Sequence, residues 1–243
     1  MILSTPGFVL HTTPYSESSV VVKVFTRQLG LRSYIIKGVR GNRGKVKQNM
    51  LQPLSCLDMV VYDSSKTDLN YIKELSLRHS TFVPDPVANA LSFFMTEVLY
   101  KALREAEPMP NLWDYVEQCA LCTDLGYSPL LTSHFSPSTP HLPIHFLLTV
   151  ARYLGIEPMD NHCAREPYFD LQEGRFVGVA TESTLPITLS ASLHGYLASP
   201  DATTSPQLDE RIALIDALLA YFHLHLGGFN HFRSHEILHT VLK

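Results

Sequence analysis

The pattern of apolar and polar residues changes near residue 80. Before it, short runs rich in β-branched and aromatic residues alternate with turn formers, which is typical of a small barrel or sandwich. In SYIIKGV (33–39), Tyr34 and Ile36 share one face of a strand, and Ile35 and Lys37 share the other. The runs that predict five strands are GFVLHTT, VVVKVFTR, LRSYIIKG, LSCLDMVVYD and LNYIKELSL.

Beyond residue 80 the apolar positions recur with a helical period. Asp85 can cap a helix that has Pro86 in its first turn, and this helix ends before Pro108. Further helical runs cover 111–126, 141–155, 187–199, 206–227 and 231–242. The sequence therefore predicts an α+β, multidomain protein. We expect a β domain over residues 1–80 and a mainly α-helical domain over 81–243, with an irregular insert near 157–186.

Charge separates the same two parts. The net charge is −4, yet residues 1–80 hold 11 Lys and Arg against 5 Asp and Glu, whereas residues 81–243 hold 8 against 18. A basic segment attracts polyanions through long-range electrostatics. The first part is therefore expected to have a polyanionic partner that the second part does not share.

Composition also bears on location. No apolar run reaches the roughly 18 residues needed to span a bilayer, and the first residues lack the basic and apolar regions of a secretory signal. Four cysteines in 243 residues do not make a disulfide framework. We expect a cytoplasmic protein with no membrane partner.

The segment IIKGVRGNRGKVKQNMLQP (35–53) is the strongest candidate for chemistry. It holds five cations and three glycines, and no acidic residue. Mobile cations follow a phosphate backbone, and glycines permit close approach. A P-loop is excluded, because Gly44 and Lys45 are followed by Val46 in place of Ser or Thr. The segment alone leaves two interpretations open, a DNA-binding loop and a solvated charged hairpin.

Several ordered motifs resemble one known family. GFVLHTTPYSESSVVVKVFTRQLGLRSYIIKGVRG (7–41) is similar to the opening of the RecO family, with its Tyr-x-Glu-Ser-like turn, Phe-Thr-Arg strand end and Lys-Gly-x-Arg segment. LQPLSCLDMVVY (51–62) resembles the strand that follows in the family, and FRSHEIL (232–238) resembles its closing segment. The order of elements matches over nearly the whole chain.

This resemblance implies an N-terminal OB-fold barrel followed by helices. It implies a DNA repair protein, associated with the nucleoid, that binds single- and double-stranded DNA and anneals complementary strands. It further implies action with RecR to load RecA onto DNA coated by single-strand-binding protein. With the basic loop, it makes these residues the predicted DNA contacts: Arg27, Arg32, Lys37, Arg40, Arg43, Lys45 and Lys47.

The family relation also implies a groove for the acidic, apolar C-terminal tail of single-strand-binding protein. Such a groove needs cations at its rim. Basic residues are scarce in the acidic part of the chain, so Arg104, Arg152 and Arg233 are the candidates, with ordinary surface arginine as the alternative for each.

One feature departs from the family. Some members carry a four-cysteine zinc site after an LG-x-x-P segment. Here Cys163 remains, Glu166 stands where the next cysteine is expected, and no later cysteine follows. We therefore predict no metal and no cofactor there, and expect the insert to be held by other contacts.

Aromatic side chains could stack on unpaired bases. The candidates in the β domain are Phe8, Phe25, Tyr34, Tyr62 and Tyr71. Most of them are expected in the barrel core.

The segment HEILH (235–239) matches the His-Glu-x-x-His pattern of zinc hydrolases. That chemistry needs a third ligand, and only TVLK follows His239. His231, one turn upstream, could complete a cluster with His235 and His239. A zinc-dependent hydrolase is therefore the alternative to the main prediction, which is a protein that is not an enzyme and has no catalytic residues.

Overall fold

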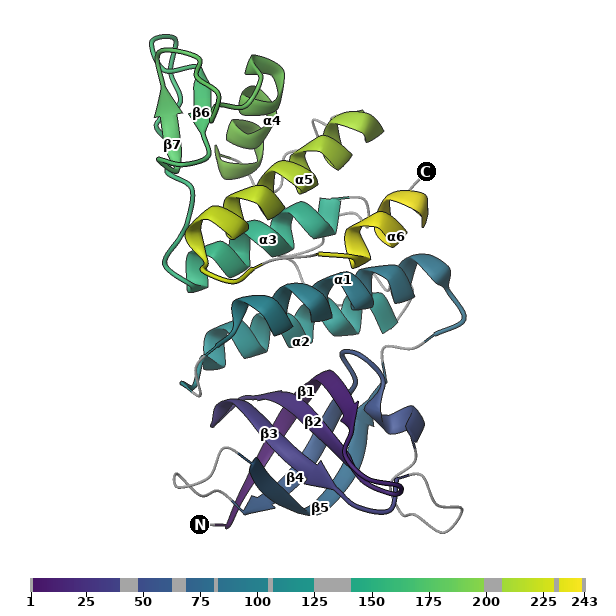
Figure 1. The fold of residues 1–243 in the computed structure, drawn as a ribbon. Helices are drawn as coiled ribbons and strands as arrows, with labels where there is room; N and C mark the ends of the chain where they lie inside the picture. Colours follow the sequence, from purple (N-terminus) through teal and green to yellow (C-terminus); the bar gives the residue numbers. More distant parts are fainter. Residues whose placement is uncertain are drawn as a thin grey trace. The chain divides into compact units, whose positions relative to one another are not determined.

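The computed structural model describes residues 2–39, 48–62, 69–80, 83–104, 107–124, 141–198, 207–229 and 232–241. The chain forms two compact units, residues 1–131 and residues 132–243. Each unit buries its own set of apolar residues. Figure 1 shows the strands and helices of the chain.

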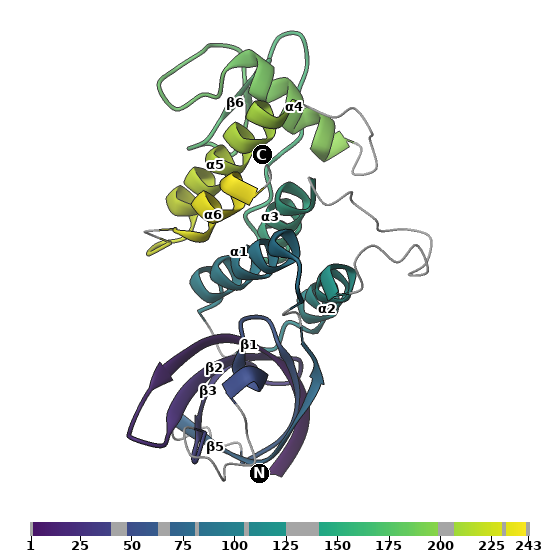
Figure 2. The same cartoon turned by 90° about the vertical axis from the view of Figure 1, so that its right-hand side faces the viewer.

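The first unit is built on a closed barrel with the strand order β1-β2-β3-β5-β4. Its strands are β1 (Ile2–Pro14), β2 (Val20–Thr26), β3 (Gly30–Ile36), β4 (Cys56–Tyr62) and β5 (Leu69–His79). All neighbours are antiparallel except β3 and β5, which pair in parallel. Figure 2 looks into the ring that these strands form. The predicted OB-like barrel followed by helices is confirmed.

Alternation along each strand fills the barrel. On β4, for example, Leu57, Met59 and Val61 are buried in the core, whereas Asp58 is exposed. Burying a Val, Leu or Met side chain contributes roughly 1.5–3 kcal/mol, so a one-residue slip in register would be costly. The pattern that predicted the strands is thus the pattern that closes the barrel.

Two helices complete the first unit, α1 (Pro86–Ala102) and α2 (Pro110–Asp124). The Asp85 side chain accepts a hydrogen bond of 2.8 Å from the Val87 backbone, which confirms the predicted cap. Trp113 of α2 packs its ring against Phe8 of β1 and donates a hydrogen bond of 3.1 Å to the Phe25 carbonyl. Compactness therefore groups α1 and α2 with the barrel, while secondary structure changes at the predicted boundary after residue 80.

The second unit contains four helices and a short hairpin within its described residues. They are α3 (Leu142–Tyr153), β6 (Tyr168–Asp170), β7 (Arg175–Val177), α4 (Ile187–Ala198), α5 (Leu208–His225) and α6 (Ser234–Val241). Helices stand at each of the predicted helical runs, and the hairpin lies inside the insert. Within the described parts of the chain, no helix is long and apolar enough to cross a membrane.

Hydrogen bonds hold the insert together. The Asp170 carboxylate accepts bonds from the backbone of Gln172 and Glu173 and from the hydroxyls of Thr181 and Ser183. Burial alone would raise the pKa of Asp170, but these four bonds outweigh it and lower the pKa.

The position where a second zinc cysteine was expected is also bonded to protein. The Glu166 carboxylate accepts a hydrogen bond of 2.7 Å from Asn161, and its backbone N–H donates to the Cys163 carbonyl. With Cys163 as the sole cysteine in the sequence of this unit, the residues present do not fit a four-cysteine site.

Candidate nucleic-acid interface

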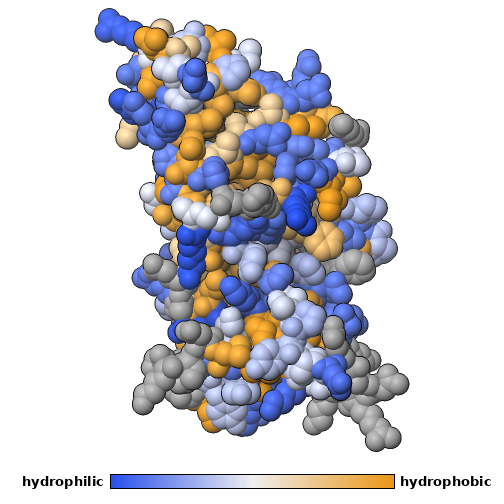
Figure 3. Space-filling model, in the orientation of Figure 1, coloured by the Kyte–Doolittle hydropathy of each residue, from blue (hydrophilic) through white to orange (hydrophobic). Residues whose placement is uncertain are grey.

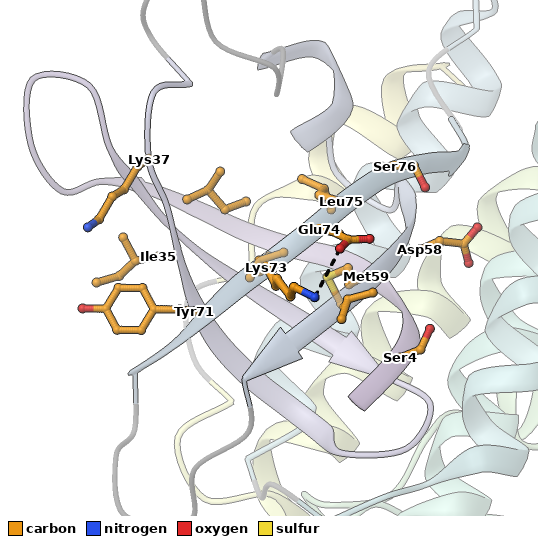
Figure 4. A pocket seen from close by; sticks show the side chains of 13 residues that line it. Ser4, Ile35, Lys37, Asp58, Met59, Tyr71, Lys73, Glu74, Leu75 and Ser76 are labelled. Carbon is orange, nitrogen blue, oxygen red and sulfur yellow. Dashed lines mark ion pairs between the residues drawn. The ribbon is translucent and has the colours of Figure 1, made fainter. Parts of the chain in front are cut away.

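Lys37 stands directly after β3, on the outside of the barrel. Tyr34 and Ile36 point into the barrel core, and the pleat places Ile35 and Lys37 on the opposite face, where Ile35 is nevertheless buried. Lys37 is exposed, and its Nζ lies 5.6 Å from the centroid of the Tyr71 ring on β5. Figure 4 shows Lys37, Ile35 and Tyr71 close together. A cation is thus fixed beside an exposed aromatic face.

Both ends of the cationic loop are anchored in the barrel core. Gly38 has a φ of +76°, a conformation that favours glycine, and turns the chain out of β3. Val39 is buried and donates a backbone hydrogen bond of 3.0 Å to Ser18. Leu51, in the short 3-10 helix η1 (Gln48–Leu51), is buried in the same core cluster. The remaining predicted contacts of the loop lie outside the described residues: Arg40, Arg43, Lys45 and Lys47.

A row of apolar and aromatic side chains crosses the barrel next to Lys37. Strand pairing sets Ile2 of β1 beside Tyr62 of β4, Tyr62 beside Tyr71, and Tyr71 beside Ile35. The exposed fractions are 56% for Ile2, 46% for Tyr62 and 50% for Tyr71. We call Lys37, Tyr62 and Tyr71 the barrel platform. Its two rings are the kind of surface on which unpaired bases stack.

The other aromatic candidates are core residues. Phe8, Phe25 and Tyr34 are each 1% exposed or less. Tyr34 lies in the cluster inside the barrel, whereas Phe8 packs against Trp113 of α2. Three of the five aromatics are therefore buried, but the expectation that most of them lie in the barrel core is not met. The two exposed ones, Tyr62 and Tyr71, are cross-strand neighbours.

A surface cavity of about 670 Å³ lies along the same strands. Its lining includes Lys37, Tyr71, Lys73, Glu74 and Asp58 (Figure 4). The Nζ of Lys73 lies 3.5 Å from a Glu74 carboxylate oxygen. Lys73 was missed by sequence reasoning, although the alternation in LNYIKEL places it two residues after Tyr71, on the exposed side.

Arg27 is held by protein. Its guanidinium donates two hydrogen bonds to Asp114 of α2, of 2.7 and 2.9 Å. These bonds lower the pKa of Asp114 and outweigh its partial burial, which acts in the opposite sense. The structure thus gives Arg27 a role in attaching α2 to the barrel. Arg32 is half-buried on β3, where it pairs with Val24 of β2.

Lys23, in the middle of β2, faces α1. Its Nζ lies 5.2 Å from the centroid of the Tyr100 ring, on which the His11 ring also stacks at 4.7 Å. Burial, and then the charge of Lys23, lower the pKa of His11. Lys23 and Lys37 therefore occupy different surroundings on the barrel.

The arginines predicted for the tail groove are distributed over both units. Arg104 follows α1 in the first unit and is exposed. Arg152 and Arg233 are exposed in the second unit, and the Nε of Arg152 donates to Glu157 at 2.7 Å. Their role stays a prediction.

The histidines of HEILH lie on α6. The His235 and His239 rings are 5.4 Å apart, and the Nε2 of His239 lies 3.5 Å from Asp216 of α5. His231 lies outside the described residues. Among residues that the structure describes, the one group of three potential metal ligands is elsewhere, at Cys56, His79 and Glu117.

The surface of the barrel mixes hydrophobic and hydrophilic residues (Figure 3, lower part). Such a surface suits a ligand with both stacked rings and charged phosphates.

Comparison with known proteins gives consistent results. Residues 1–81 match the family model described as Recombination protein O N terminal. Over the whole length, the chain is similar to proteins named DNA repair protein RecO. It is 24% identical to that of Azobacteroides pseudotrichonymphae genomovar. CFP2 and 28% identical to those of Porphyromonas gingivalis and Christiangramia forsetii. Each of these alignments covers 99% of this chain and 99% of the relative.

Proposed function

We propose that this chain is a DNA repair protein of the RecO family, because residues 1–81 match that family's N-terminal model and the whole chain is similar to proteins named DNA repair protein RecO. It binds single- and double-stranded DNA on its barrel and anneals complementary strands. With RecR, it helps to load RecA onto strands coated by single-strand-binding protein. Binding, annealing and loading need no catalytic residue. The protein acts on DNA, so we place it in the cytoplasm, at the nucleoid.

The observation that carries the proposal is the barrel platform beside the anchors of the cationic loop. Lys37 lies 5.6 Å from the Tyr71 ring, and Val39, two residues later, is buried where the loop begins. On this surface, cations can bind the phosphates of a DNA strand, and the aromatic rings can stack on its bases. We assign DNA contact to Lys37 and to the loop cations Arg40, Arg43, Lys45 and Lys47. Arg32 stays a predicted contact at the margin.

Annealing follows from charge. Two DNA strands repel each other through their phosphates, and cations that contact both lower this repulsion. A cationic loop can bind strands of any sequence, because contacts to phosphates do not distinguish the bases. The protein can therefore gather complementary strands and leave recognition to base pairing.

The protein partners are proposed on the family relation. RecR and the acidic tail of single-strand-binding protein are the expected partners, with Arg104, Arg152 and Arg233 as candidates for the tail. The ion pair between Arg152 and Glu157 leaves part of the Arg152 side chain exposed, at 61%. The alternative is a zinc-dependent hydrolase centred on HEILH. The described residues give no specific support for it, because His239 faces Asp216 and Glu236 is exposed on α6.

Strand annealing tests the proposal. Two complementary oligonucleotides carrying a donor and an acceptor dye are mixed with protein, and the rise in energy transfer gives the annealing rate. We expect the triple variant Lys37→Ala, Arg40→Ala, Arg43→Ala to anneal at least about tenfold more slowly at 0.15 M salt, because phosphate contacts are lost.

The matched control removes three cations from the second unit, Arg152→Ala, Arg165→Ala and Arg175→Ala. It has the same change in net charge and should anneal at nearly the wild-type rate. Equal slowing of the two triple variants would show that net charge acts, and would reject the barrel as the annealing surface.

A further inference from the structure

We propose that Cys56, His79 and Glu117 form a binding site for a divalent cation of the zinc class. One ligand atom from each residue, a thiol sulfur, an imidazole nitrogen and a carboxylate oxygen, lies within 4.8 Å of the other two. The three residues come from β4, β5 and α2, all in the first unit. This site is separate from the barrel platform and is independent of the proposed function.

A β-bulge brings the first two ligands together. Cys56 pairs with His79 across β4 and β5, whereas the next pair is Leu57 with Leu77, so Arg78 is an extra residue on β5. Bulges redirect side chains and are frequent beside functional sites. If the present sequence paired regularly beyond Leu57 and Leu77, Arg78 would stand opposite Cys56 and His79 would lie on the other face of the sheet.

The site lies where α2 covers the outer face of the barrel. Cys56 has no exposed surface, His79 is half-buried, and the Glu117 side chain is 23% exposed. The Phe8 ring meets the His79 ring edge-on at 5.9 Å and also contacts Trp113 of α2. The sulfur is therefore in apolar surroundings, and solvent has access on the Glu117 side for a water as fourth ligand.

The charges fit a divalent ion. Arg78 lies 3.3 Å from Glu117 and 3.8 Å from Asp58. A divalent cation with one thiolate and one carboxylate is electrically neutral, and Arg78 with Asp58 forms a second neutral pair. The metal is thus accommodated without an unbalanced charge at the junction.

The donor set selects the ion. A thiolate, an imidazole and a carboxylate suit zinc, whereas magnesium and calcium prefer oxygen alone. Bond lengths of about 2.0–2.3 Å in a tetrahedron place ligand atoms roughly 3.4–3.8 Å apart. The three ligand atoms lie within 4.8 Å of one another, so they must close by at most roughly 1.4 Å when a metal binds.

Binding exchanges a proton for the metal. A cysteine binds a metal through its thiolate, so the Cys56 thiol must release its proton. The cation displaces this proton to solvent as the bond to sulfur forms. The bound ion then joins β4, β5 and α2, and acts as a clamp between helix and barrel.

Cobalt(II) is the probe for this site, because its thiolate complexes absorb visibly. Chelator-washed full-length protein is titrated with cobalt(II), and absorption is followed in the near ultraviolet, where sulfur-to-cobalt charge transfer occurs, and in the visible. We expect one ion per chain, a charge-transfer band, and loss of the band when zinc is added. Cys56→Ser should abolish the band.

Two further variants make the test decisive. Glu117→Gln changes a partly exposed ligand and should weaken cobalt binding at least tenfold while the protein stays folded. Cys163→Ser removes an exposed cysteine of the second unit and should leave band and affinity unchanged. The proposal is overturned by the absence of the band in wild type, by its survival in Cys56→Ser, by its loss in Cys163→Ser, or by unchanged affinity in Glu117→Gln.

Discussion

Lys37 and Arg27 show how neighbours decide what a surface cation can do. Both were predicted to contact DNA. Arg27 is bonded through two nitrogens to Asp114, whereas Lys37 stands exposed beside an aromatic ring. Bidentate pairs between arginine and carboxylate are strong and directional. Pairing with α2 was not visible in the sequence, because Asp114 is 87 positions away.

Tyr71 should distinguish single from double strands. Tyr71→Ala removes a half-exposed ring, and we expect binding of single-stranded DNA to weaken by about 1–3 kcal/mol, because stacking on unpaired bases is lost. Duplex binding should change little, since paired bases are not free to stack. Titration of labelled oligonucleotides of both kinds measures the difference. Tyr153→Ala, which changes a 37% exposed tyrosine of the second unit, is the control. An equal loss for both kinds of DNA would contradict a stacking role.

Asp170 should tie the stability of the insert to pH. Asp170→Asn leaves several donors with a poorer acceptor, and we expect it to lower the free energy of unfolding by about 1–3 kcal/mol at pH 7. The folded pKa of Asp170 is lowered, so its stabilisation is complete above the ordinary aspartate pKa of about 3.9 and is lost as pH falls through the folded pKa.

Urea unfolding of wild type and Asp170→Asn at pH 7, 5, 4 and 3 measures this. The difference between the two proteins should be constant at pH 7 and 5 and narrow below about pH 4. Glu182→Gln changes an exposed carboxylate of the same insert and should match wild type at pH 7. A difference that stays constant down to pH 3 would exclude Asp170 as the titrating group.

At the scale of elements, periodicity predicted most of the fold. Alternation identified the five strands, helical spacing identified the helices, and the Asp85–Pro86 pair marked the start of α1. The pairing of the strands could not be predicted from periodicity, because it depends on contacts between segments that are distant in the sequence. Nor could the bulge at Arg78, which a single extra residue creates.

The candidate site also has one part that the sequence predicts and another that depends on the fold. The cationic loop was visible as local composition, whereas the neighbourhood of Tyr62 and Tyr71 required the register of β4 against β5. Cys56, His79 and Glu117 form no motif, since they meet only when the strands pair and α2 docks. Local chemistry can thus be read from the chain, and sites shared by elements need the fold.

Substitution of two glycines tests the backbone conformation at the end of a strand and in the interior of a helix. Gly38, with its φ of +76°, leaves β3 for the loop, and Gly38→Ala should cost about 1 kcal/mol of stability through strain. Gly195 lies within α4, with open space at its Cβ position, so Gly195→Ala should stabilise by about 0.5–1 kcal/mol. Denaturant unfolding gives both values. The same sign for both substitutions would contradict the backbone assignments.

At the scale of the whole molecule, the basic charge is local. Residues 1–131 hold 13 Lys and Arg against 12 Asp and Glu, because α1 and α2 bring acids to the barrel's unit. Residues 132–243 hold 6 against 11. Neither unit is strongly basic, so the proposed attraction to DNA rests on cations close together at one part of the barrel. Fields of this kind are screened within about 8 Å at physiological salt.

The most direct test of the central claim is therefore the salt dependence of DNA binding. Fluorescence anisotropy of a labelled single-stranded oligonucleotide is measured at salt concentrations from about 0.05 to 0.3 M, a range over which phosphate contacts change affinity strongly. The proteins compared are wild type, the Lys37, Arg40, Arg43 triple alanine variant, and the Arg152, Arg165, Arg175 control. We predict that the slope of log K against log salt becomes shallower by about 2 in the first variant only, since each lost phosphate contact contributes about 0.7. Equal slopes for all three proteins would contradict the claim that the Lys37 end of the barrel binds DNA.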